Sequence, residues 1–157
     1  MIRKISSRST EALVEELFRH QVLCRLATRR EDTPAANRHL VKIWQIADAL
    51  AVTTAGRLAL ETLMEHSDPD IRLRGAEAAK AWNLNKAIPV LARLLIDDLD
   101  SRFSPVERLE VRISAAHQLY DHFGIRNYDQ NHLIVPLSAY GIELQPIERT
   151  CWQPKGG

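Results

Sequence analysis

The residues best suited to metal binding or acid–base chemistry lie close together in one segment. His117 and Asp121 are four residues apart, and His122 follows directly. Residues four apart share one face of an α-helix, and histidine both ligates metals and transfers protons near neutral pH. A helix turns about 100° per residue, so His122 lies about 140° round from His117 and spoils a three-ligand site. We expect a solvated or hydrogen-bonded helix face here, and an enzyme built on His117 and Asp121 is the hypothesis we favour least.

A second candidate pair, His20 and Cys24, is also spaced by four residues. Such a pair could form an activated thiol if a third group oriented the histidine. The surrounding residues are mostly apolar and offer no such group, so core packing is the better interpretation. The sequence contains no HExxH, GxSxG, glycine-rich phosphate loop or paired-carboxylate motif. It therefore predicts no catalytic residue, no cofactor and no metal ion.

Basic residues gather in two places where they could contact a nucleic-acid backbone. The set comprises Arg25, Arg29, Arg30, Arg38, Arg72, Arg74, Lys80 and Arg112. Acidic residues are interspersed among them, including Glu31, Asp32 and Glu110, and these would cancel much of the positive field. A nucleic-acid-binding scaffold of the DNA-repair type is therefore our alternative hypothesis, behind intramolecular salt bridges as the role of these arginines.

The acidic loop, residues 97–100, is the surface feature that points most directly to a partner. It lies between two expected helical repeats, where repeat proteins commonly carry binding insertions, and its acids could meet a basic protein surface. A solvated turn whose acids cap or screen neighbouring helices is an equally good interpretation. The predicted partner-binding residues are Asp97, Asp98, Asp100, Glu77, His117 and Asp121.

The composition is that of an ordinary globular domain. The chain has 157 residues, 45% of them hydrophobic and 26% charged, which suits one folded domain. The formal net charge of +1 gives no global field to hold a polyphosphate or an anionic membrane. No stretch approaches the roughly 20 apolar residues of a membrane span. Cys24 and Cys151 lack CxxC spacing, so we expect a reduced, cytoplasmic protein.

Apolar residues recur at three- and four-residue intervals and predict the six helices that must position these side chains. The expected bounds are about residues 9–28, 34–52, 58–66, 69–82, 85–98 and 105–123. Two segments, Ser67-Asp68-Pro69-Asp70 and Ser104-Pro105-Val106-Glu107, carry strong start signals, with a capping residue before a proline and an acid in the first turn. Thr33 and Asn85 are the expected caps of the second and fifth helices. Residues 53–56 are expected to form a break.

The fourth expected helix is rich in small side chains. They are Gly75, Ala76, Ala78, Ala79 and Ala81. Such residues let neighbouring helices approach closely, so we expect this helix in the interior of the molecule.

Beyond Gly124, prolines and a glycine interrupt any long helix. Residues 133–135 and 142–144 could be short strands or parts of a broken helix. We expect residues 125–157 to form an irregular tail that docks on the last hairpin through apolar residues. The whole chain, residues 1–157, is then one domain, with residues 9–54 as an N-terminal hairpin.

Two short segments repeat one pattern at an offset of about 40 residues, which falls in the range of HEAT and armadillo units. Residues 58–123 resemble two HEAT-type repeats. In that family an acid near the turn and an arginine at the start of the second helix tie neighbouring repeats together. Asp68 or Asp70 with Arg72 match those places, and Arg112 matches in the second unit, where Glu107 or Glu110 would replace the aspartate. The resemblance implies an all-α fold, a short right-handed α–α superhelix.

Residues 13–95 are also similar to a small bacterial family of unknown function with HEAT-like repeats. The similarity rests on Asn37, on the apolar run to Leu50 and on residues 63–72. It implies no established activity and supplies no catalytic residues.

These observations together favour a non-catalytic protein–protein interaction module. Its expected partner is another protein. We do not expect it to bind nucleic acid or a membrane. Within that class we expect an immunity-type inhibitor that binds and neutralises a toxin with a basic surface, an analogy that fold alone does not establish.

Overall fold

The structure is a computed structural model that describes residues 8–148. Within this range all regular structure is helical, which confirms the expected all-α class. The elements are α1 (Thr10–Arg29), α2 (Thr33–Ala51), α3 (Thr54–Leu63), α4 (Pro69–Ala79), α5 (Leu84–Ile96), α6 (Pro105–Phe123), the 3-10 helix η2 (Gln130–Leu133) and α7 (Ile134–Ser138). None of the helices in the described range is long and apolar enough to span a bilayer.

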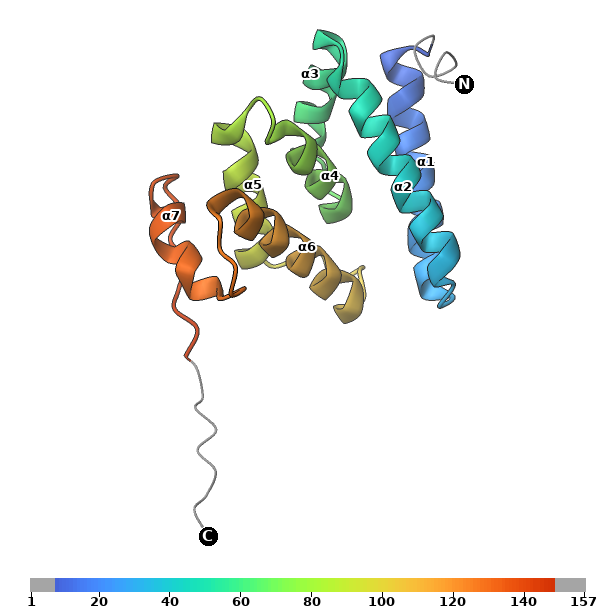
Figure 1. Ribbon diagram of the computed structural model, residues 1–157. Coiled ribbons are helices and arrows are strands. Elements are labelled where there is room, and N and C mark those ends of the chain that lie inside the picture. Colours follow the sequence, from blue (N-terminus) through green and yellow to red (C-terminus); the bar gives the residue numbers. More distant parts are fainter. Residues whose placement is uncertain (1–7, 149–157) are drawn as a thin grey trace.

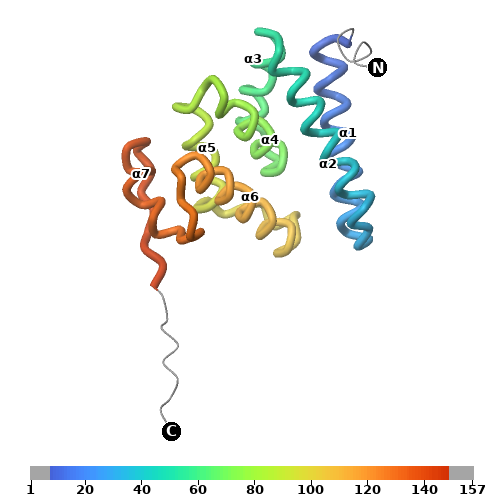
Figure 2. The backbone as a smooth tube through the Cα atoms, viewed as in Figure 1, coloured from blue at the N-terminus to red at the C-terminus, as the bar shows by residue number. Residues whose placement is uncertain are grey.

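The helices follow one another as hairpins across the molecule. Helix α1 packs on α2, α3 on α4, and α5 on α6, and η2 with α7 lies at the far end from α1 (Figure 1). The backbone trace shows the chain advancing from one pair to the next, with the start of α6 directed back toward the α1–α2 hairpin (Figure 2). Helix α4 contacts α1, α2, α3, α5 and α6, so it occupies the interior position that its small residues predict.

Gly75 explains how α4 comes so close to α3. A Cβ atom at this position would lie 2.6 Å from the carbonyl oxygen of Leu60, a distance that real Cβ atoms do not tolerate. Ala76 and Ala79 are fully buried on the same helix. Close packing therefore compensates for the cost of a glycine in a helix interior, about 1 kcal/mol relative to alanine.

Three predicted helix starts are confirmed by side-chain caps. Ser9 accepts a hydrogen bond from the amide of Ala12, and Asp68 from that of Asp70. Ser104 and Glu107 form the expected capping box at α6. Gly124 ends α6 in a left-handed conformation with φ of 69°, as glycine permits.

Three other caps differ from the prediction. Asp32 rather than Thr33 caps α2, and Asn83 rather than Asn85 caps α5, because their side chains accept hydrogen bonds from amides three residues ahead. Thr53 caps α3 in the same way, so this helix begins at Thr54 instead of near residue 58. The expected break at residues 53–56 is thus the first turn of a helix.

Apolar side chains form two clusters that meet at α4. The N-terminal cluster joins α1 to α4 through residues such as Leu17, Ile43 and Leu60. The C-terminal cluster joins α4 to the segment after α6 through residues such as Leu91 and Leu119. Both contain several side chains with no more than 2% exposure, so two continuous apolar interiors share one central helix.

The segment after Gly124 is more regular than the sequence predicts. Residues 133–135 are helical, in η2 and α7, and residues 142–144 are neither strand nor helix. Leu133, Leu137 and Ile142 are buried in the C-terminal cluster. Their burial explains why a proline-containing stretch still forms short helices. Cys151 and Pro154 lie outside the described residues.

Candidate functional site

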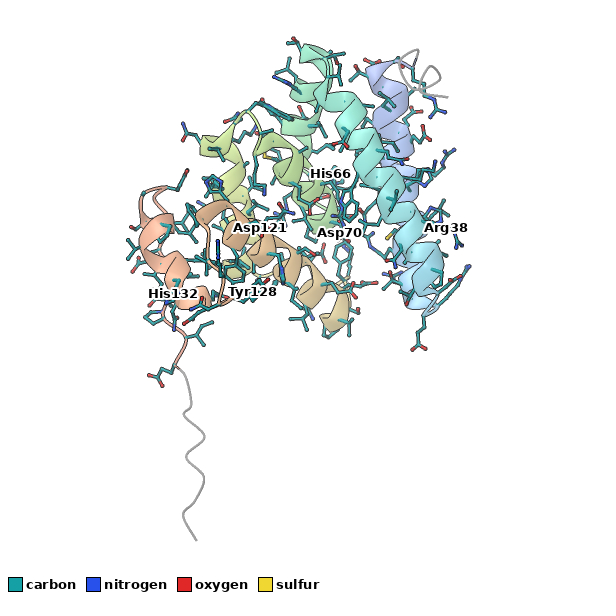
Figure 3. The ribbon with its side chains drawn as sticks, in the orientation of Figure 1. Arg38, His66, Asp70, Asp121, Tyr128 and His132 are labelled. Carbon is teal, nitrogen blue, oxygen red and sulfur yellow. The ribbon has the colours of Figure 1, made fainter. Side chains whose placement is uncertain are left out.

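A groove lies where α1, α2, α4 and α6 meet. Its volume is about 310 Å³, and side chains of all four helices line it. Asp70, in the first turn of α4, lies on the side of that helix that faces the α1–α2 hairpin (Figure 3). Arg38 lies on the side of α2 that faces away from α4. The lining residues come from distant parts of the sequence: Gln21 and Ser114, which both line the groove, are 93 positions apart.

Arg25 of α1 ties the first hairpin to the start of α4. Its Nη2 donates to Asp68 Oδ2 at 2.8 Å and to Asp70 Oδ2 at 2.7 Å. The guanidinium also stacks over the ring of Phe103, 4.7 Å from the ring centre, a favourable cation–π geometry. Burial opposes the charge of Arg25, but hydrogen bonds to Asp70 and Asp68 outweigh it and raise the pKa of Arg25. Arg25 is therefore held as a cation by two carboxylates.

Glu107 ties α1 to the start of α6. Arg29 Nε donates to Glu107 Oε1 at 2.5 Å, and the same carboxylate accepts from the backbone amide of Ser104 at 2.9 Å. The Arg29 hydrogen bond is the main reason that the pKa of Glu107 lies below its usual value. One carboxylate thus completes a helix cap and joins two helices.

Glu77, a predicted partner-binding residue, is engaged within the protein. Arg74 Nη1 donates to Glu77 Oε2 at 3.1 Å, and Arg74 Nε donates to Gln21 Oε1 at 3.3 Å. The Glu77 side chain is only 14% exposed. Glu77 therefore holds the guanidinium group of Arg74, which lines the groove.

Glu110 stands on the α6 wall of the groove and is exposed. Among the described residues, no hydrogen bond or ion pair reaches its carboxylate. Partial desolvation raises the pKa of Glu110, and the neighbouring charges of Asp70 and Glu107 raise it further. This carboxylate is therefore open to an external partner.

Apolar side chains border the groove on two sides. Ile113 of α6 and Leu40 of α2 line it. Leu109 precedes Ile113 by four residues and is 56% exposed, and Trp44 follows Leu40 by four residues and is 48% exposed. Residues four apart share a helix face, so Leu109 and Trp44 are exposed apolar neighbours of the groove and do not belong to its lining.

The acidic loop is less available than its sequence indicates. Asp97 and Asp98 are exposed, but Asp100 forms an ion pair with Arg102 at 2.6 Å. Hydrogen bonds from the Arg102 side chain and backbone lower the pKa of Asp100. Leu99 is buried in the C-terminal cluster. The loop is anchored at its centre, and two of its three acids face solvent.

The expected arginine–acid links between repeats are wrong. Asp68 and Asp70 bind Arg25, not Arg72. Arg112 donates to the carbonyl oxygens of Leu94, Leu95 and Asp97 instead of binding Glu107 or Glu110. It satisfies carbonyl groups at the end of α5, as basic side chains near helix C-termini do. Arg25 of the first hairpin therefore takes the place expected of Arg72, and Arg112 binds backbone instead of an acid.

His117, Asp121 and His122 lie toward the other end of α6, and all three are exposed. The His117 ring contacts Tyr120 and Tyr128, with ring centres 6.2 and 5.3 Å apart, and Figure 3 shows Asp121 and Tyr128 in that region. Within residues 8–148 no group of three or more histidine, cysteine or acidic side chains is placed to hold a metal ion. None of the six predicted partner-binding residues lines the groove.

His20 and Cys24 do not contact each other as a pair. His20 Nδ1 lies 3.0 Å from Nδ1 of His39 on α2, and Cys24 Sγ donates to the carbonyl oxygen of Ala36 at 3.4 Å. Burial raises the pKa of Cys24, which disfavours the reactive thiolate. Both side chains thus join α1 to α2, as the packing interpretation requires.

Comparisons with known proteins supply no relative for this chain. No protein-family model, no curated protein and no solved structure matches it. The two family resemblances described from the sequence stay predictions. Function is inferred from the groove and the surfaces beside it.

Proposed function

We propose that the protein is a non-catalytic interaction module that binds a segment of another protein in the groove. The observation that carries this proposal is the combination of apolar side chains on two sides of the groove, Leu40 and Ile113, with a carboxylate, Glu110, that has no partner among residues 8–148. Protein-binding surfaces commonly place apolar anchors beside a polar rim. Two other charged groups that line the groove are paired within the protein: Arg25 of α1 with Asp68 and Asp70 at the start of α4, and Glu107 of α6 with Arg29 of α1.

A short right-handed superhelix of HEAT or armadillo type is the finer form of the fold that we infer. The succession of helical hairpins supports it (Figure 2). In such solenoids the concave side carries the binding surface. Here α2, α4 and α6, the second helices of the three hairpins, supply most of the groove lining.

An immunity-type inhibitor that neutralises a toxin with a basic surface is the narrower form of the proposed function. The exposed acids Asp97 and Asp98 support a basic partner. The free thiol of Cys24 suits a reducing compartment, so we place the protein in the cytoplasm. The nucleic-acid alternative has less support, because Arg25, Arg29 and Arg74 are already paired with carboxylates.

A matched pair of substitutions tests the interaction module. Ile113 in the groove is 49% exposed, and Leu58 on α3 is 59% exposed and outside it. Wild-type, Ile113→Glu and Leu58→Glu proteins are used to capture partners from cells that naturally contain the protein, and each captured protein is then purified and titrated. We expect at least tenfold weaker binding for Ile113→Glu and little change for Leu58→Glu. Equal affinity for all three would contradict the groove as the binding surface, and circular dichroism checks that each variant folds.

A further inference from the structure

We propose that the occupant of the groove is a basic amphipathic segment of the partner protein, whose lysine or arginine pairs with Glu110. This inference rests on the proposed function and names the chemistry of the partner. It concerns the groove, which is separate from the acidic loop at residues 97–100.

The groove is acidic although the whole chain is not. The chain carries a formal net charge of +1. Five carboxylates against three guanidinium groups line the groove or are ion-paired with its lining: Asp68, Asp70, Glu77, Glu107 and Glu110 against Arg25, Arg29 and Arg74. Each of the three arginines already binds a carboxylate. The excess negative charge is therefore local, and in the lining itself three carboxylates stand against two guanidinium groups.

Glu110 is the group that would pair with a cation of the partner. The charges of Asp70 and Glu107, which line the same groove, have the same sign as that of Glu110 and raise its pKa further after desolvation. An added ammonium or guanidinium group would relieve this repulsion and gain a charge-assisted hydrogen bond. A phosphate or an acidic peptide would increase the repulsion. The unpaired carboxylate thus selects the sign of the partner's charge.

The apolar residues beside Glu110 favour a partner segment that also has an apolar face. On α6 the exposed residues Val106, Leu109 and Ile113 recur three and four positions apart, so they form a stripe along one face. One end of this stripe, Ile113, lines the groove together with Leu40 of α2. A partner segment with one apolar face and a flanking cation satisfies both features, as amphipathic segments in hydrophobic grooves do.

A peptide display experiment tests the inference with defined probes. A random library of 16-residue peptides is selected on the wild-type protein and counter-selected on Ile113→Glu. We expect enriched peptides with apolar residues beside a lysine or arginine. Synthetic copies of them should bind Glu110→Gln roughly fivefold to tenfold more weakly than wild type. Asp48→Asn, an exposed acid on α2 outside the groove, is the matched control and should leave binding unchanged.

A charge reversal gives a second readout. On Glu110→Lys the same library should yield peptides enriched in acidic residues at the corresponding position. Two results would overturn this inference: selection of neutral or acidic peptides on the wild-type protein, or peptide binding that Glu110→Gln does not weaken. Either result would still be compatible with the interaction module. Failure to enrich any peptide that distinguishes wild type from Ile113→Glu would overturn both proposals.

Discussion

Helix α6 packs against the rest of the protein on two sides that differ in kind. On one side Val111, Ala115 and Leu119 are buried among apolar residues of α5 and of the segment after Gly124. On the other side Glu107 reaches α1 through an ion pair with Arg29, and Glu110 faces open space in the groove. We call these the apolar side and the polar side of α6.

The difference shows where stability and binding are separated in this molecule. Burial of apolar surface contributes about 25 cal/mol per Å² and is not screened by salt. Ion pairs near a surface contribute less and weaken as ionic strength rises. The apolar side therefore stabilises the fold, whereas the polar side keeps a surface that a partner can occupy without disturbing the core.

The largest effect is expected on the apolar side. Leu137 of α7 is fully buried, whereas Val135 of the same helix is 78% exposed. Leu137→Ala should lower the free energy of unfolding by about 3 kcal/mol, because it removes buried methyl groups and leaves a cavity. Val135→Ala should change it by less than about 0.5 kcal/mol. Urea denaturation at 25 °C measures both, and equal losses would show that α7 is not part of the core.

A smaller loss is expected on the polar side. Arg25→Met leaves Asp68 and Asp70 without their guanidinium partner and should cost about 2 kcal/mol of unfolding free energy. The loss is limited because Arg25 Nε is itself buried without a hydrogen-bond partner among the described residues. Arg19→Met is the control, since Arg19 is 65% exposed. The difference between the two variants should shrink in 1 M salt. A salt-independent difference would mean that packing, not charge, joins these helices.

The smallest effect is a pH dependence within the first hairpin. Burial, the proximity of His39 and the charges of Arg19 and Lys42 lower the pKa of His20, against a raising contribution from Glu16. The unfolded chain therefore binds more protons than the folded one below about pH 6.5. The free energy of unfolding should fall as the pH drops from 7 to 5.5, by less than either loss above.

His20→Gln provides the control for this pH dependence, because it removes the titrating ring. The unfolding free energy of this variant should change less between pH 7 and 5.5 than that of wild type. Urea titrations of both proteins across that range measure the difference. An unchanged slope would assign the response to other groups.

Local signals in the sequence predict most of the fold. Ser9, Asp68 and the Ser104–Glu107 capping box mark helix starts correctly, because each cap forms within four residues of chain. The other caps are harder to place where two candidate residues lie close together in sequence. Asn83 and Asn85, for example, both have suitable side chains, and Asn83 is the one that accepts from a first-turn amide, that of Lys86.

The groove was not predictable in the same way. Arg25 and Asp68 are 43 positions apart, and Arg29 and Glu107 are 78 apart. No local pattern specifies such pairs. The three acids of residues 97–100 lie close together in the sequence and are easy to identify, but Asp100 is ion-paired with Arg102. The spacing of Val106, Leu109 and Ile113, exposed apolar residues on a predicted helix, was the available signal for a binding face.

The double role of Glu107 bears on how the chain folds during synthesis. Arg29 leaves the ribosome 78 residues before the carboxylate that pairs with it, so this ion pair cannot form until residue 107 has been synthesised. The same carboxylate then completes the capping box of α6 and the link to the end of α1.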